Sequence, residues 1–332
     1  MGALRISILF FLTVVLATFV MLASSRDLRP ASLKEYEGET SGFLSFNQVM
    51  SDAVPCGRRD NQPPLLTTSE TRHSHTIVAD YLEPRSSAFL EPRDLPGIVK
   101  LEPEYDLSPN EVAKGHCSAT RIARNWFVTA AHCVASGYDR IVLKTGNENL
   151  TANNIRTVAV DYAMCHSGFR GETTQQYEND LSLLHISNDN LFALTDVPVV
   201  KWGVTSQPFS TVKFRSARVG GWGLKTYGGE LNDHLQKMEL DILHIDRRVI
   251  RLSSRAGRGP CVGDSGGPLI VSDEGRPVLM GVLSTISSNR YGEMCAGNYV
   301  SNYTNLTAYR SWAFNTMAVC EASDARCRVS EG

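Results

Sequence analysis

From about residue 97 onward, the chain consists of short runs of β-branched and aromatic residues separated by Gly, Asn and Ser. Clear examples are residues 126–129, 140–143, 157–160 and 278–283. Runs of this length are typical of strands in an antiparallel sandwich or barrel. The sequence therefore predicts an all-β fold for this part of the chain.

One segment near the carboxyl end has a different period. Residues 306–319 place four residues at helical spacing, namely Tyr309, Trp312, Ala313 and Thr316. This spacing predicts a single C-terminal amphipathic helix.

Residues 1–25 have the features of a secretory signal peptide. Arg5 precedes an apolar run over residues 6–23, and small residues follow at the positions that signal peptidase reads. We expect cleavage before Arg26. An uncleaved anchor is the alternative, because the run approaches the length that spans a bilayer. In either case the rest of the chain faces an oxidising compartment, so the eight cysteines are expected to form disulfides.

Residues 26–76 form a predicted pro-segment of loose order, since they mix charges with prolines and show no sustained period of 2 or 3.6. The composition is that of a globular protein, with 42% apolar residues and a formal charge of −2. This balance gives no basic excess for nucleic acid. Three Asn-X-Thr acceptor sites, beginning at Asn149, Asn302 and Asn305, agree with secretion.

Three short motifs carry reactive side chains. His132 lies in the string Thr-Ala-Ala-His-Cys, Asp180 in Asn-Asp-Leu-Ser-Leu-Leu, and Ser265 in Gly-Asp-Ser-Gly-Gly-Pro. A serine hydroxyl attacks a carbonyl well only when a base takes its proton, and imidazole titrates near neutrality. A carboxylate can hold that imidazole in the required tautomer. The three residue types together favour acyl-transfer chemistry.

Taken together, the motifs resemble those of the chymotrypsin-like (trypsin-fold) serine proteases, in which His, Asp and Ser follow in this order. The string Val-Gly-Gly-Trp-Gly at residues 219–223 also looks like a segment of that family. The resemblance covers roughly residues 77–320 and leaves residues 321–332 as a tail. It implies two six-stranded antiparallel β-barrels with a short C-terminal helix, and the triad between the barrels.

The resemblance also implies roles for neighbouring residues. The N–H groups of Gly263 and Ser265 would form the oxyanion hole. Ser284 would support Asp180 and open the substrate-binding strand. Two disulfides are implied, Cys117–Cys133 and Cys261–Cys295.

Four further cysteines allow three pairings. Among these we favour Cys320–Cys327, which are close in sequence, and Cys56–Cys165, which would tether the pro-segment after cleavage.

Members of the family are made as zymogens, and a new Ile-Val amino terminus pairs with the aspartate before the nucleophile. Here that aspartate is Asp264, and Ile77 begins the nearest Ile-Val pair. Thr76 precedes Ile77, where the family usually has Arg or Lys. We therefore expect an ion pair between Asp264 and Ile77 in the mature protein.

Gly259 occupies the position where trypsin-like members have the aspartate that binds Arg or Lys. We therefore expect the primary pocket to prefer a substrate residue other than Arg or Lys. Ser284, Ile286 and Ser301 complete the expected pocket, and Ile286 would narrow it towards small or medium apolar side chains. The alternative is a preference for acidic residues through two nearby arginines, Arg258 and Arg290.

The function expected from these features is secreted serine endopeptidase activity through an acyl-enzyme intermediate. The expected partners are protein or peptide substrates and protein protease inhibitors. No cofactor, metal or nucleic acid is required, and a membrane is involved only if residues 1–25 remain as an anchor. The alternative function is a catalytically silent binding or adhesion protein on the same fold.

Overall fold

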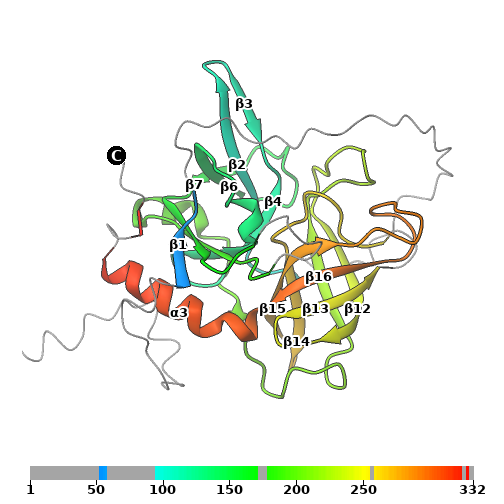
Figure 1. Cartoon of the computed structure of the whole chain (residues 1–332). Helices are drawn as coiled ribbons and strands as arrows, with labels where there is room; N and C mark the ends of the chain where they lie inside the picture. The colour runs from blue at the N-terminus through cyan, green and yellow to red at the C-terminus, as the bar shows by residue number, and fades with distance from the viewer. Residues whose placement is uncertain (1–51, 58–93, 171–177, 255–257, 324–326, 329–332) are drawn as a thin grey trace, which may run out of the picture. The chain divides into compact units, whose positions relative to one another are not determined.

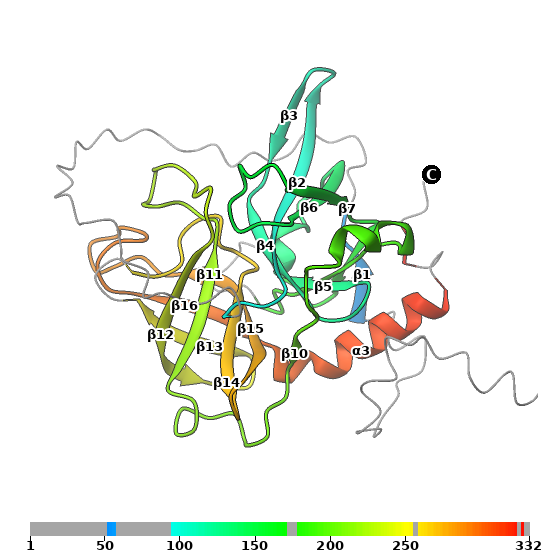
Figure 2. The ribbon, with the colours of Figure 1, turned by 180° about the vertical axis from the view of Figure 1, so that it is seen from behind.

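The computed structural model describes residues 52–57, 94–170, 178–254, 258–323 and 327–328. These residues form two mainly antiparallel sheets and one long C-terminal helix (Figures 1 and 2). Each sheet uses the short apolar runs predicted from the sequence. Among the described residues, no helix is both long and apolar enough to cross a membrane.

The first sheet pairs in the order β1-β8-β9-β5-β4-β2-β6-β7, and β3 adds to β2 as a hairpin. Its strands are β1 (Ala53–Pro55), β2 (Ile98–Ser108), β3 (Glu111–Lys114), β4 (Cys117–Arg121), β5 (Trp126–Thr129), β6 (Arg140–Thr145), β7 (Arg156–Ala159), β8 (Tyr162–His166) and β9 (Ser182–His185). All of these pairings are antiparallel.

The second sheet closes into a six-stranded barrel, because β15 pairs with β14 and also with β16. Its strands are β10 (Lys201–Trp202), β11 (Ser216–Gly221), β12 (Gln236–Ile245), β13 (Val249–Ser254), β14 (Pro268–Asp273), β15 (Arg276–Ile286) and β16 (Tyr299–Asn305). The two-residue strand β10 lies outside the closed ring and pairs with β15 in parallel. Closure removes the exposed edges that an open sheet would leave.

The two sheets share part of one apolar core. The larger core cluster contains side chains of the first sheet together with Ile270, Leu279 and Val282 of the barrel. A second cluster, which includes Val219, Ile250 and Leu252, fills the barrel. Burial of each large aliphatic side chain stabilises the fold by roughly 1.5–3 kcal/mol, so the shared cluster strongly favours a fixed contact between the sheets.

Helix α3 (Leu306–Ala322) follows β16 directly. The four residues whose spacing predicted the helix, Tyr309, Trp312, Ala313 and Thr316, are all buried. Asn305 caps the helix, since its side-chain oxygen accepts a hydrogen bond from Thr307 N at 3.1 Å. Asn305 is only 2% exposed and also donates to the Asp246 carbonyl at 2.8 Å. Its predicted glycosylation site is therefore hidden in the folded chain.

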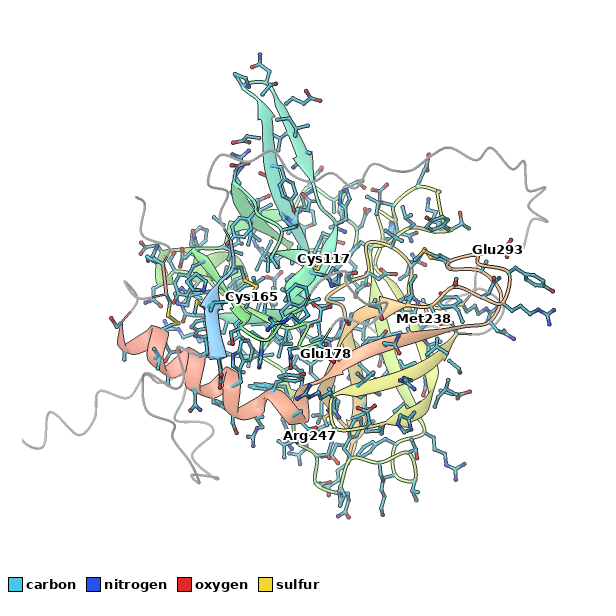
Figure 3. All side chains as sticks on the ribbon, in the orientation of Figure 1. Cys117, Cys165, Glu178, Met238, Arg247 and Glu293 are labelled. Atoms are coloured by element: carbon cyan, nitrogen blue, oxygen red, sulfur yellow. A yellow bond between two sulfur atoms is a disulfide. The ribbon has the colours of Figure 1, made fainter. Side chains whose placement is uncertain are left out.

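The described part of the predicted pro-segment is ordered on the first sheet. β1 pairs with β8, and the disulfide Cys56–Cys165 joins the two segments (Figure 3). Trp312 of α3 donates its indole N–H to the Asp52 carbonyl at 2.7 Å. The tail is held as well, because Cys320 and Cys327 form a disulfide. The structure thus contains both pairings favoured from the sequence.

The predicted fold class, all-β with a short C-terminal helix, is confirmed. The first sheet differs from the predicted six-stranded barrel, because it has nine strands and no strand pairing among the described residues closes it. The helix ends at Ala322, three residues beyond the predicted end at Val319.

The helix cap generates a stability prediction. Replacing Asn305 with Ala removes the cap, so we expect the free energy of unfolding to fall by about 1 kcal/mol or more. Asn149→Ala is the matched control, since the Asn149 side chain accepts hydrogen bonds from Thr151 in an exposed turn and its loss should cost less than about 0.5 kcal/mol. Urea unfolding of protein made without glycosylation measures both. Equal losses would contradict the cap assignment.

Candidate active site

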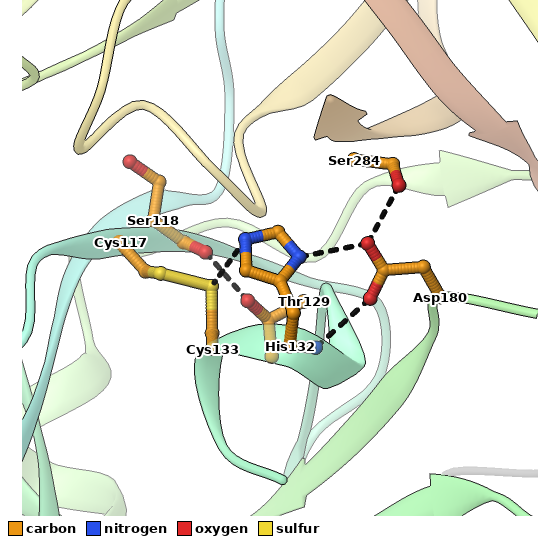
Figure 4. The surroundings of a disulfide bond; sticks show 7 residues. All are labelled: Cys117, Ser118, Thr129, His132, Cys133, Asp180 and Ser284. Carbon is orange, nitrogen blue, oxygen red and sulfur yellow. Dashed lines mark hydrogen bonds and ion pairs between the residues drawn. A yellow bond between two sulfur atoms is a disulfide. The ribbon is translucent and has the colours of Figure 1, made fainter. Parts of the chain in front are cut away.

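His132 and Asp180 lie at neighbouring strand ends of the first sheet. His132 sits in a single 3-10 turn (Ala131–Cys133) that follows β5, and Asp180 precedes β9. Strands β5 and β9 pair side by side. His132 Nδ1 is 2.7 Å from Asp180 Oδ2, and the backbone N–H of His132 donates to Asp180 Oδ1 at 2.9 Å (Figure 4). Pairing of the strands therefore brings together two residues that are far apart in the sequence.

The carboxylate of Asp180 is fully buried and is held from both sheets. Ser284 of β15 donates its hydroxyl to Asp180 Oδ2 at 2.6 Å (Figure 4). Thr304 of β16 donates its hydroxyl to the Asp180 carbonyl at 2.9 Å. A buried carboxylate is tolerated only when donors compensate its desolvation, and His132 with Ser284 supplies these donors, whereas Thr304 binds the backbone of Asp180.

Asp180 changes the acidity of the imidazole. Burial lowers the pKa of His132, but the Asp180 charge and its hydrogen bond outweigh burial and raise the pKa above its ordinary value. Because Nδ1 faces Asp180, the other ring nitrogen, Nε2, points away from this carboxylate. The Cys117–Cys133 disulfide holds this turn against β4, and Cys133 Sγ lies 3.9 Å from Nε2.

Ser265 lies in a glycine-rich loop just before β14. Its carbonyl accepts a hydrogen bond from Ser118 N of β4 at 2.7 Å. Gly266, with a φ of 75°, allows this approach, since a Cβ there would lie 2.2 Å from both the Ser118 carbonyl oxygen and Thr129 Oγ1. The serine loop therefore packs directly on the strands that carry the His132 turn.

Gly263 and Asp264 complete the loop. Gly263 has a φ of 91°, which favours glycine. Asp264 is buried, and its two carboxylate oxygens accept backbone N–H groups from Gly223 at 2.6 Å and from Cys261 at 2.8 Å. Burial raises the pKa of Asp264 despite these donors. The Cys261–Cys295 disulfide fixes the start of the loop. Ile77, the expected partner of Asp264, lies outside the described residues.

The expected pocket residues lie on neighbouring segments of the barrel. Strand pairing places Ile286 opposite Ser301. Ser301 is fully buried, whereas Ile286 is half-buried and packs against the barrel core. A Cβ on Gly259 would lie 2.0 Å from Ser254 Oγ and 2.5 Å from Tyr299 Oη. No side chain larger than hydrogen fits at residue 259 without a shift of its neighbours.

The two arginines considered as alternative pocket residues do not show that role. Arg258 and Arg290 are exposed, and Arg290 lies over the Tyr291 ring at 4.7 Å. The ligand atoms of Cys117, His132 and Cys133 cluster within 4.8 Å of one another. Both cysteine sulfurs form the disulfide, so they are not the thiolates that bind metals.

Sequence reasoning missed several residues that shape this site. Thr304, Ser254 and Tyr299 reach it only through strand pairing in the barrel, so no local motif marks them. Lys100 is buried next to apolar residues on β2, and its charge among them is a signal that the sequence did contain.

The His132–Asp180 contact generates a pH prediction. Asp180→Asn removes the negative charge that raises the pKa of His132, while the burial that lowers it remains. We therefore expect the pKa of His132 to fall, as read by proton NMR of the imidazole. Asp161→Asn, which alters the separate pair with His185 at 2.9 Å, is the control and should leave the titration of His132 unchanged. An unchanged pKa in Asp180→Asn would contradict this electrostatic account.

Comparison with known proteins agrees with this geometry. A family model described as Trypsin matches residues 107–313. Trypsin-1 of Astacus astacus is 27% identical over 232 residues, which are 63% of this chain and 92% of that protein. Coagulation factor IX of Cavia porcellus is 25% identical over 223 residues, which are 61% of this chain and 73% of that protein. Because the family model spans more than half of the chain, the protein belongs to the trypsin family, the chymotrypsin-like serine proteases.

Proposed function

We propose that this chain is a secreted serine endopeptidase with Ser265, His132 and Asp180 as its catalytic triad. The observation that carries the proposal is the buried Asp180 carboxylate, which contacts His132 Nδ1 at 2.7 Å. The alternative of a silent binding protein is not favoured.

The first half of the reaction forms an acyl-enzyme. Ser265 Oγ attacks the peptide carbonyl carbon as His132 Nε2 takes the hydroxyl proton. The backbone N–H groups of Gly263 and Ser265 would stabilise the oxyanion. The tetrahedral intermediate then collapses as the imidazolium donates its proton to the leaving amine, which breaks the C–N bond and leaves an ester on Ser265.

The second half releases the acid product. A water molecule gives a proton to His132 Nε2 as its oxygen attacks the ester carbonyl. Collapse of the second intermediate returns the proton to Ser265 Oγ, so the enzyme ends in its starting state. Throughout, Asp180 holds the imidazole in the tautomer with Nδ1–H and stabilises its charged form.

The pocket geometry supports a preference for small or medium apolar side chains. Gly259 supplies no carboxylate for Arg or Lys, and Ser254 with Tyr299 fills the space beside it. Ser301, which has a longer side chain than glycine, is buried on the facing strand. A long cationic side chain would therefore meet no counter-charge at residue 259.

The proposed activity predicts a defined cleavage profile. The purified, processed protein, with its mature amino terminus confirmed, and its Ser265→Ala variant are each incubated with a diverse peptide mixture, and the products are identified by mass spectrometry. We expect cuts after small or medium apolar residues from the wild type, and a loss of at least about 10⁴-fold in Ser265→Ala. Cuts after Arg or Lys would contradict the pocket assignment. Silence from both proteins would favour the binding alternative.

We further propose that the chain is made with a signal peptide over residues 1–25 and is processed before Ile77. Residues 26–76 would then be the pro-segment, residues 77–320 the protease domain and residues 321–332 the tail. Asn149 is the glycosylation site that we favour over Asn305, because Asn305 is buried. Protein protease inhibitors are the expected regulators.

Processing before Ile77 has a covalent consequence that can be measured. Because Cys56 and Cys165 form a disulfide, the released pro-segment should stay attached without reductant and separate with it. N-terminal sequencing of active protein should then give two sequences, one that begins at Ile77 and one from the pro-segment. The Cys56→Ser/Cys165→Ser variant should give the Ile77 sequence alone. A mature chain that begins elsewhere would contradict this assignment.

A further inference from the structure

Three of the four charged residues on one side of strand β2 are buried, and these three form its buried charged face. Lys100, Glu102 and Glu104 are 1%, 4% and 8% exposed. Residues two apart on a strand share a face, and the alternate residues Val99 and Leu101 point into the apolar core. A charged face that is buried needs partners on whatever covers it.

Both acidic residues of this face have cations. Glu102 lies 2.9 Å from Lys144 Nζ and 3.6 Å from Lys114 Nζ. Glu104 lies 2.8 Å from Lys114 Nζ and 2.6 Å from Arg140 Nε. Lys100 differs, since its Nζ is buried and has no hydrogen-bond partner among the described residues. Among the described residues Lys100 therefore makes no ion pair within 4.0 Å, although Glu102 lies on the same face of the strand.

The serine loop contains a buried acidic side chain, that of Asp264. Asp264 accepts two backbone N–H groups, but no ion pair within 4.0 Å joins it to a cation of the described chain. Neutral N–H donors supply no positive charge to this carboxylate. The ionised forms of Lys100 and Asp264 carry opposite charges.

The two groups approach each other at β4. Lys100 pairs with Ser118 across the β2–β4 ladder, so their side chains share one face. Ser118 N binds the Ser265 carbonyl, which places the serine loop against this residue. A Cβ on Gly221 would lie 3.2 Å from Ser118 Oγ and 2.4 Å from Asp264 Oδ1, so the Ser118 hydroxyl and the Asp264 carboxylate are near neighbours.

From this arrangement we propose that the Lys100 ammonium is an internal counterion of the Asp264 carboxylate and positions the Gly263–Ser265 loop before any new amino terminus is formed. Buried charges are screened much less than surface charges, so Lys100 can act without direct contact. The inference rests on the proposed function. It makes Lys100 a positioning residue, because it acts on catalysis only through Asp264.

The charge of Lys100 is expected to depend on pH near neutrality. Burial lowers its pKa to about 8, while Asp264 and Glu102 raise it and Lys144 lowers it. His116 also faces Lys100, and burial lowers the pKa of His116. The ammonium is therefore present below about pH 8 and is lost as the pH rises through this value. Positioning by Lys100 should fail over the same range.

A double-mutant cycle in urea tests the pair without reference to activity. Lys100→Met removes the cation with little change of length, and Asp264→Asn removes the anion. We compare the effect of Lys100→Met on the folding equilibrium constant in the two backgrounds. This effect should be about tenfold more favourable in Asp264→Asn than in the wild type, because only in the wild type does the mutation remove the counterion of a carboxylate. Lys144→Met, whose cation pairs with Glu102, should combine with Asp264→Asn additively. Additive effects of Lys100→Met and Asp264→Asn would overturn the proposal.

Covalent labelling tests the positioning role. The full unprocessed chain, verified by intact mass, is treated with a fluorophosphonate that modifies an activated serine. We expect Ser265 to be labelled in the wild type and in Lys100→Arg, and at least about tenfold more slowly in Lys100→Met. The wild-type rate should fall above about pH 8, and Lys144→Met should move this fall to higher pH. An unprocessed wild type that resists labelling, or a Lys100→Met variant that labels normally, would overturn the proposal.

Processed protein separates this failure from failure of the proposed function. If labelling appears only after processing and is unaffected by Lys100→Met, the protease assignment stands and the role of Lys100 falls. If neither form is labelled, the protease assignment falls together with the positioning role. The urea cycle still decides whether the two charges are coupled.

Discussion

The contact between the buried Asp180 carboxylate and His132 is the interaction on which the site depends. Asp180 is fully buried, and its donors come from the first sheet through His132 and from the barrel through Ser284. Loss of one donor would leave part of a charge unpaired in the interior, at a cost of roughly 1–3 kcal/mol or more. The requirement to satisfy this carboxylate therefore fixes both the imidazole and the relation between the two sheets.

The serine loop contacts the first sheet through its backbone. Ser118 N binds the Ser265 carbonyl, and the missing side chain of Gly266 allows the loop to touch β4 and β5. Any larger residue at Gly266 would push the loop away from the strands that carry the His132 turn. Glycine is thus required by close approach as well as by a positive φ.

Much of this arrangement could be predicted from the sequence, because local motifs carry it. The strings around His132, Asp180 and Ser265 identify the family, and helical spacing identifies α3. Pairings between distant segments could not be predicted in the same way. The strand β1 has only three residues and no period to detect, so its place beside β8 is visible only in the structure.

The surroundings of the pocket and of Lys100 could not be predicted from the sequence either. The space beside Gly259 is filled by Ser254 and Tyr299, which meet through the pairing of β13 with β16. Lys100 lies among apolar residues of β2, but its proposed partner Asp264 lies in the serine loop, far away in the sequence. Short-range patterns predict which residues react, and long-range packing decides what surrounds them.

The most direct test of the account is the pH dependence of Ser265 modification by a fluorophosphonate. If His132 is the base, the rate should rise as the pH passes through the pKa of His132, above its ordinary value of 6.5. The same rise should be absent in His132→Ala. A rate that is independent of pH and unaffected by His132→Ala would contradict the assignment of Ser265 and His132 as nucleophile and base.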